Sequence, residues 1–179
     1  METLSKVEIT LLAVFLGWFL GQGAELLKSY WKRRVLLKAF YNELGDISDH
    51  LNESMSKCES GLINLLKTRQ SSVSPHPVVR PIYDNYYKDI CTFLSPEQRK
   101  IVNQIHGHVA GFNERLSSSG EQKNLDTNFM CMYTDAAWAK ESISYLIQYK
   151  GSKSLADDLS KIESINKDFQ RVWNGYIRG

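Results

Sequence analysis

The sequence predicts an all-α fold, in which an N-terminal transmembrane helix continues into a long helix and a cytoplasmic helical bundle. Residues 9–24 form an uncharged apolar run. Most of the later sequence repeats apolar residues in steps of three and four, which is the period of one helical face. No segment alternates polar and apolar residues for long enough to predict a strand. The 179 residues suit one anchor, residues 1–27, and one bundle domain, residues 28–179.

The first predicted element is the apolar run, which corresponds to about 24 Å of helix against roughly 30 Å of hydrocarbon core. Leu4, Val7, Leu26 and Leu27 extend its apolar length, so we expect a single crossing of the membrane. A cleaved signal peptide is the alternative, because the small residues at 21–23 suit a signal peptidase. The first eight residues argue against cleavage, since they carry one Lys and two Glu instead of a basic start.

Basic residues follow the apolar run, while the residues before it carry little net charge. The basic set is Lys28, Lys32, Arg33, Arg34 and Lys38. By the positive-inside rule, the N-terminus should lie outside and the C-terminal domain in the cytoplasm.

Small residues line one side of the predicted membrane helix. At about 100° per residue, a narrow stripe holds Thr10, Ala13, Gly17, Gly21 and Ala24. Small residues let helix backbones approach closely in lipid, and Gly17 with Gly21 forms a G-x-x-x-G pair. We therefore expect this face to contact a helix of another copy or of another protein. The alternative is that Gly and Ala are simply common in membrane helices.

The long helix is predicted to continue past the membrane to the linker at residues 70–81, which holds three of the four prolines. Gly45 and Gly61 within it permit bending or close packing. Its apolar face consists of Leu37, Phe40, Leu44, Ile47, Leu51, Met55, Cys58, Leu62 and Leu65.

A second helix is predicted from Pro81 to about Leu94, because proline is favoured in the first turn of a helix. Its inner face would hold Ile82, Tyr86, Ile90 and Phe93. Ser95, Pro96 and Gln98 then supply an N-cap, a first-turn proline and a capping-box partner for a third helix. That helix would bury Ile101, Val102, Ile105, Val109, Phe112 and Leu116.

A turn at residues 117–124 precedes a fourth helix at about residues 127–149, which Gly151 should end. A fifth helix is predicted to begin near Ser154. Its apolar stripe consists of Leu155, Leu159, Ile162, Ile165, Phe169, Val172 and Tyr176.

Composition excludes several classes of function. The 22 basic and 20 acidic residues give a net charge of only +2, so the bulk charge does not support RNA or DNA as a partner. Common phosphate-binding, zinc-protease and serine-hydrolase motifs are absent, and no cofactor is expected. Cys58, Cys91 and Cys131 are predicted to be small buried side chains in a reducing compartment. His106 and His108 point to nearly opposite sides of a helix, so we expect no shared metal ion.

The third predicted helix carries one set of residues with possible chemistry. Arg99 and His106 are seven positions apart, which places them on one helical face about 10 Å apart, with Asn103 between them. Such a group could bind a phosphodiester, with arginine stabilising charge and histidine transferring a proton. The alternative is structural, because short patterns recur by chance: Arg69 and His76 show the same spacing in the linker.

Taken together, these features resemble the small membrane accessory proteins of type VI-B CRISPR systems, which have a divergent HEPN domain. The resemblance rests on the apolar anchor ITLLAVFLGWFLGQGAELL, the basic LKSYWKRRVLLKAF, the helical body and the Arg99/His106 pair. It implies a ring-shaped homo-oligomer that forms a pore in the bacterial inner membrane. It further implies that this pore strengthens antiphage defence once an RNA-guided RNA-cutting effector detects phage RNA.

The resemblance also bears on catalysis. Lys100 follows Arg99 here, whereas active HEPN nucleases favour Asn, Asp or His at that position. A membrane-tethered RNase that uses Arg99, Asn103 and His106 is therefore the second hypothesis, and a non-catalytic membrane adaptor is the third.

Overall fold

The computed structural model describes residues 6–68, 74–118 and 124–178. Within these residues all regular structure is helical, which confirms the predicted all-α class. The α-helices are α1 (Lys6–Thr68), α2 (Pro81–Ile90), α3 (Pro96–Ser118), α4 (Leu125–Tyr149) and α5 (Leu159–Arg178). Two short 3₁₀ turns, η1 (Cys91–Phe93) and η2 (Leu155–Asp157), follow α2 and precede α5.

The chain divides into two compact units, Met1–Ala39 and Phe40–Gly179, and α1 contributes to both. The predicted membrane segment lies in the first unit. Its described side chains from Ile9 to Val35 are exposed, apart from the half-buried Gly23. The second unit contains the hydrophobic core.

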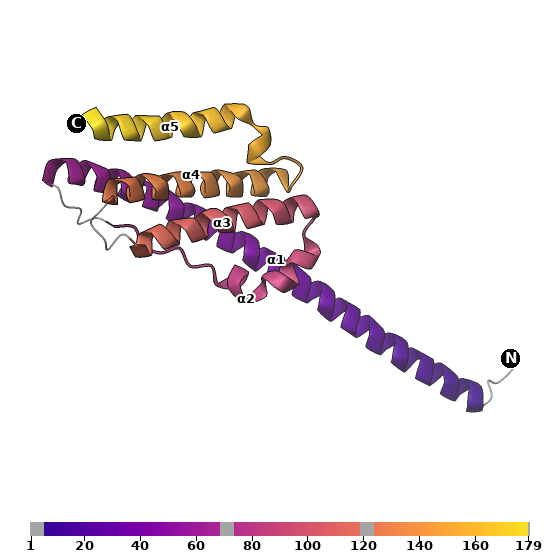
Figure 1. Ribbon diagram of the computed structural model, residues 1–179. Helices are drawn as coiled ribbons and strands as arrows, with labels where there is room; N and C mark the ends of the chain where they lie inside the picture. The colour runs from indigo at the N-terminus through magenta and orange to yellow at the C-terminus, as the bar shows by residue number, and fades with distance from the viewer. Residues whose placement is uncertain (1–5, 69–73, 119–123, 179) are drawn as a thin grey trace. The chain divides into compact units, whose positions relative to one another are not determined.

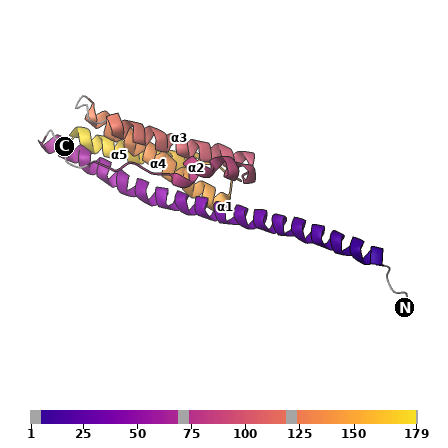
Figure 2. The ribbon, with the colours of Figure 1, turned by 90° about the horizontal axis from the view of Figure 1, so that it is seen from below.

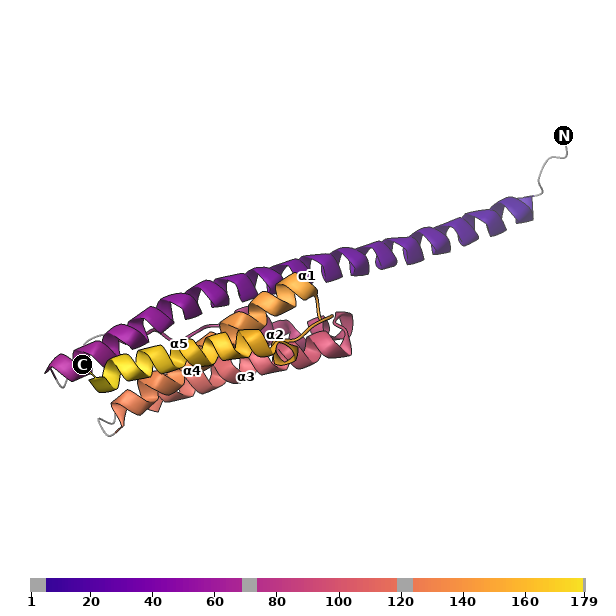
Figure 3. The ribbon, with the colours of Figure 1, turned by 90° about the horizontal axis from the view of Figure 1, so that it is seen from above.

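In the second unit, α3 and α4 run antiparallel beside each other, and α5 follows α4 in the opposite direction (Figure 1). The other two views show the same neighbours (Figures 2 and 3). The core between these helices is apolar and closely packed. Its largest fully buried side chains include Phe40, Leu44, Ile47, Leu51, Leu62, Ile105, Phe112, Met132, Ile143 and Leu146.

The start of α3 and the end of α4 agree with the prediction, whereas α2 ends at Ile90 instead of near Leu94 and α5 begins at Leu159 instead of near Ser154. The Ser95 hydroxyl accepts from the Gln98 backbone N–H at 3.2 Å, and the Gln98 side-chain oxygen accepts from the Ser95 N–H at 2.9 Å. This reciprocal pair starts α3 where it was expected. At the end of α4, Lys150 and Gly151 adopt positive φ angles of 49° and 88°, and the helix ends at Tyr149, as predicted.

Three predictions about buried faces need correction. In α2, Tyr86 is exposed, and Tyr83 and Tyr87 face α3 instead. In α5, Leu159 is exposed, because the helix begins at this residue and its first turn does not reach the core. Of the cysteines only Cys58 is buried, since Cys91 and Cys131 are half-buried. Parts of the predicted linker and turn, residues 69–73 and 119–123, lie outside the described residues, as does Leu4.

The described part of the linker, residues 74–80, has no regular structure but lies against α3. The Asn113 side chain pairs with both backbone groups of Val78: it accepts from the N–H and donates to the carbonyl, each at 2.8 Å. Val78 is also buried. This contact fixes the segment that leads into α2.

Candidate functional site

The three predicted catalytic residues lie on one face of α3, but they differ in accessibility. Arg99 and Asn103 are exposed, while the His106 side chain is only 2% exposed. The helical spacing therefore places the three residues on the same face. Their exposure differs because other side chains cover them to different extents.

Helix α2 covers the part of this face nearest His106. The Tyr83 ring stacks on the His106 ring, with centroids 3.4 Å apart and planes 20° apart. One turn further on, the Tyr87 hydroxyl donates to the Asn103 side-chain oxygen at 2.9 Å. The Arg80 guanidinium donates to the His106 carbonyl oxygen at 3.1 Å and lies 5.3 Å from the Tyr83 ring centre.

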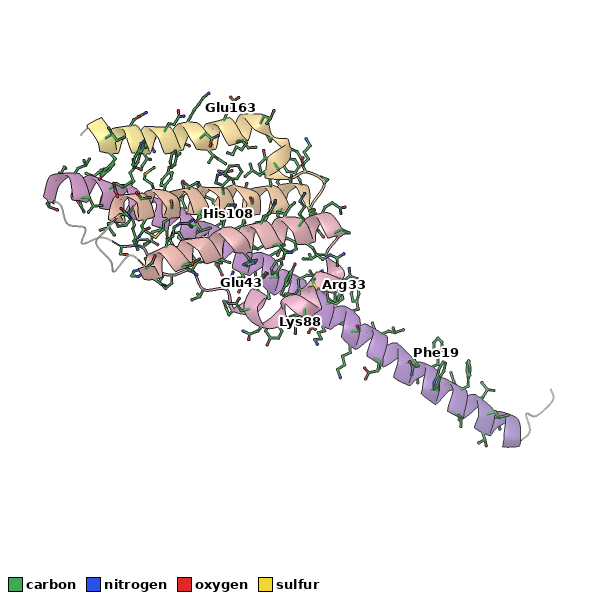
Figure 4. The ribbon with its side chains drawn as sticks, viewed as in Figure 1. Phe19, Arg33, Glu43, Lys88, His108 and Glu163 are labelled. Carbon is green, nitrogen blue, oxygen red and sulfur yellow. The ribbon has the colours of Figure 1, made fainter. Side chains whose placement is uncertain are left out.

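A buried carboxylate holds α2 in this position. Glu43 of α1 is 7% exposed and accepts from the backbone N–H groups of Ile82 at 2.5 Å and Tyr83 at 2.9 Å. These N–H groups belong to the first turn of α2 and have no partner within the helix. A negative charge there also complements the helix dipole. Figure 4 shows Glu43 on α1 close to the start of α2.

The environment of His106 favours its neutral form. Neither ring nitrogen has a hydrogen-bond partner among the described residues. Burial, with a smaller contribution from the nearby Arg80 charge, lowers the pKa of His106 to about 3. An imidazole in this setting has neither solvent nor a polar group with which to exchange a proton. The geometry thus favours the structural alternative for Arg99 and His106, and their catalytic role stays a prediction.

The five predicted contact residues of the membrane helix all lie in the N-terminal unit, and all five are exposed. No atom lies within 4 Å of where a Cβ would stand at Gly17 or Gly21. No close approach within the chain therefore requires glycine at either position.

The large apolar side chains of the same unit are also exposed. From Ile9 to Leu27 their exposed fractions lie between 48% and 73%. Phe19 projects outward from α1 (Figure 4). Within the described residues, this is the one helix long and apolar enough to cross a membrane, judged by length and composition.

A second polar cluster, which the sequence analysis missed, lies between α3 and α4. Asp135 accepts from His108 Nδ1 at 3.0 Å through one oxygen and pairs with the Arg115 guanidinium through the other. The Trp138 ring lies nearly parallel to the His108 ring, at 6.2 Å. His108 and Arg115 are seven residues apart, which is the same spacing as that between Arg99 and His106. The sequence could therefore have shown that His108 and Arg115 share a helical face. Asp135 comes from the next helix, and no local pattern points to it.

No group of three or more His, Cys, Asp or Glu side chains in the described part of the chain is placed to hold a metal ion. The polar clusters that the structure does contain are ion pairs and hydrogen bonds between helices.

Comparison with protein-family models, curated proteins and solved structures gives no match for this chain. The fold and the sites are therefore interpreted from their own geometry.

Proposed function

We propose that this protein is anchored in a membrane by the N-terminal part of α1 and associates there with copies of itself. The observation that carries the proposal is the exposure of the apolar side chains between Ile9 and Leu27. Soluble proteins rarely expose a continuous apolar surface of this extent, because its contact with water is unfavourable. Hydrocarbon removes that cost, and an α-helix satisfies its own backbone hydrogen bonds there.

The distribution of charge supports a helix that crosses the membrane over one that lies on its surface. At about 100° per residue, Lys28, Lys32, Arg33, Arg34 and Lys38 spread around the whole circumference of the helix. A surface-bound helix would carry its charges along one side only. Tyr30 and Trp31 lie among these basic residues, at the level where aromatic side chains meet lipid head groups. By the positive-inside rule, this arrangement supports a cytoplasmic location for the bundle.

Self-association is supported by the stripe Thr10, Ala13, Gly17, Gly21 and Ala24. No contact among the described residues accounts for glycine at positions 17 and 21, whereas close packing against a second helix in lipid would. A ring of such helices would line an opening in the inner membrane with small and apolar groups. The link to an RNA-guided RNA-cutting effector and to antiphage defence rests on the sequence resemblance.

The membrane potential of cells tests the pore. Cells that express the chain with an activated effector should depolarise more than cells with the effector alone. A variant with Gly17→Leu and Gly21→Leu should lose this effect, because the larger side chains hold the helices apart. A matched variant with Ala substitutions at Leu11 and Phe15, which lie off the stripe, should retain it. Depolarisation no greater than with the effector alone would contradict the proposal.

A further inference from the structure

The bundle contains a pocket that the membrane role does not use. It lies between α4 and α5, reaches α3 at Arg115, and has a volume of about 400 Å³. This is within the range of about 300–1,000 Å³ that small-molecule sites occupy. It lies wholly within the second unit. Its lining includes Met130, Cys131, Tyr133, Trp138, Phe169 and Trp173.

Aromatic and sulfur-containing side chains form one part of the pocket wall. Tyr133 and Trp138 come from α4, and Phe169 and Trp173 come from α5. Aromatic side chains gain energy beyond simple burial when they pack against another ring. Met130 and Cys131 add sulfur atoms, which also pack well against rings. The wall is therefore suited to a flat aromatic ligand.

The polar end of the pocket is formed by Arg115 and Asp135. Both oxygens of Asp135 are already paired, one with His108 and the other with Arg115. The Arg115 guanidinium has five N–H donors, and among the described residues Asp135 is its one partner. This end of the pocket therefore has spare donors and no unpaired carboxylate oxygen.

Gly111 makes room for this arrangement. A Cβ at this position would lie 3.0 Å from Arg115 Nη1 and 3.1 Å from Asp135 Oδ2. A larger residue here would require the side-chain ends of this ion pair to shift by a few tenths of an ångström. The absence of a side chain thus keeps the guanidinium at the end of the pocket.

We propose that this pocket binds a small planar aromatic anion, such as an aromatic carboxylate. The ring packs between the aromatic side chains of α4 and α5. The carboxylate accepts from the unused N–H groups of Arg115, which suit a planar two-oxygen acceptor.

Calorimetric titration of 2-naphthoate into the full chain, held in nanodiscs of zwitterionic lipid, tests the proposal, with empty nanodiscs as the blank. The parent should bind 2-naphthoate. Its affinity for the neutral 2-naphthalenemethanol should be lower by a factor of about ten or more, because a charged hydrogen bond is lost. Equal affinity for the two compounds, or no binding of 2-naphthoate at millimolar concentration, would overturn the proposal.

Three variants locate the site. Arg115→Gln should weaken 2-naphthoate binding by about tenfold or more and leave the neutral compound unaffected. Lys100→Gln is the matched control, since it removes an exposed positive charge from the same helix about 22 Å away and should not change binding. Equal losses in both variants would contradict the assignment. Cys131→Phe should block both compounds by filling the pocket. Should it fail to fold, the comparison of the two ligands still decides the question.

Discussion

The imidazole of His106 shows how a residue with an apparent catalytic pattern can instead serve packing. It is stacked against Tyr83 and has no hydrogen-bond partner for either nitrogen among the described residues. Leaving a buried polar group unpaired costs about 1–3 kcal/mol. The histidine is therefore tolerated in the fold at a cost, and a ring of the same shape without nitrogens would remove that cost.

Replacing His106 with phenylalanine should raise the free energy of unfolding at pH 7 by about 1 kcal/mol or more, because the stack on Tyr83 remains and the unpaired nitrogens are removed. Urea unfolding in mild detergent, followed by circular dichroism, measures this change. A loss of stability would show that the nitrogens have a partner in the native protein.

The same residue predicts a pH dependence. The folded pKa of His106 is about 3, below the usual value near 6.5, so the unfolded chain binds a proton that the folded chain does not. The stability due to neutral His106 is complete above about pH 6.5 and falls with decreasing pH, by up to about 1.4 kcal/mol per unit, until about pH 3.

His106→Phe should make the decrease in unfolding free energy between pH 6.5 and pH 4 shallower, and a pH series of urea midpoints measures it. His76→Gln, which alters an exposed histidine, is the control and should leave the slope as in the parent. An unchanged slope in His106→Phe would mean that other groups cause the acid sensitivity.

At the scale of elements, sequence patterns predict where helices begin and end better than which face they bury. Ser95, Gln98 and Gly151 define helix ends through contacts with near neighbours in the sequence, so local patterns suffice. The orientation of α2 depends on Glu43, which lies 39 residues before its partner Ile82. The apolar side of this helix is a wide arc of isoleucines and tyrosines, and the sequence alone could not choose which of its tyrosines would be covered.

The sequence predicts the candidate site only in part, again because contacts between distant parts of the chain cannot be read from local patterns. Helical spacing correctly places Arg99, Asn103 and His106 on one face. The burial of His106 depends on Tyr83, which belongs to another helix and reaches α3 only because Glu43 holds α2. The spacing of residues within α3 carries no information about which side chain of another helix buries His106.

Two glycines of α1 predict opposite effects of the same substitution. A Cβ at Gly61 would lie 2.8 Å from Cζ of Phe129, whereas a Cβ at Gly45 would meet no atom within 4 Å. Gly45→Ala should stabilise the protein by up to about 1 kcal/mol through helix propensity alone. Gly61→Ala should destabilise it, because the Phe129 ring must move within a packed core. Urea unfolding compares the two, and a gain in stability for both would show that α1 and α4 are not closely packed here.

The Glu43 cap on α2 predicts a further loss of stability. Glu43→Gln should lower the free energy of unfolding by about 1–3 kcal/mol, because the amide brings one acceptor and no charge to two backbone N–H groups. The exposed Asp46, three residues later, supplies the matched control, and Asp46→Asn should change stability by less than about 0.5 kcal/mol. Equal effects of the two changes in urea unfolding would contradict the cap.

At the scale of the whole molecule, the chain combines a unit with a buried apolar core and a unit whose apolar side chains are exposed. The core of the second unit is buried by its own helices, while the apolar side chains of the first unit are exposed. Sequence hydropathy predicts the long apolar N-terminal helix, because that property depends on composition along one segment. What contacts its stripe of small residues is a property of the assembly and cannot be read from one chain.

The central claim is that this helix brings copies of the chain together in the membrane. Its most direct test is the mass of the full chain in lipid nanodiscs, compared with the variant that carries Gly17→Leu and Gly21→Leu. The account predicts several copies per particle for the parent and a shift to single copies for the variant. A parent that is monomeric, or a variant that assembles as the parent does, would contradict it.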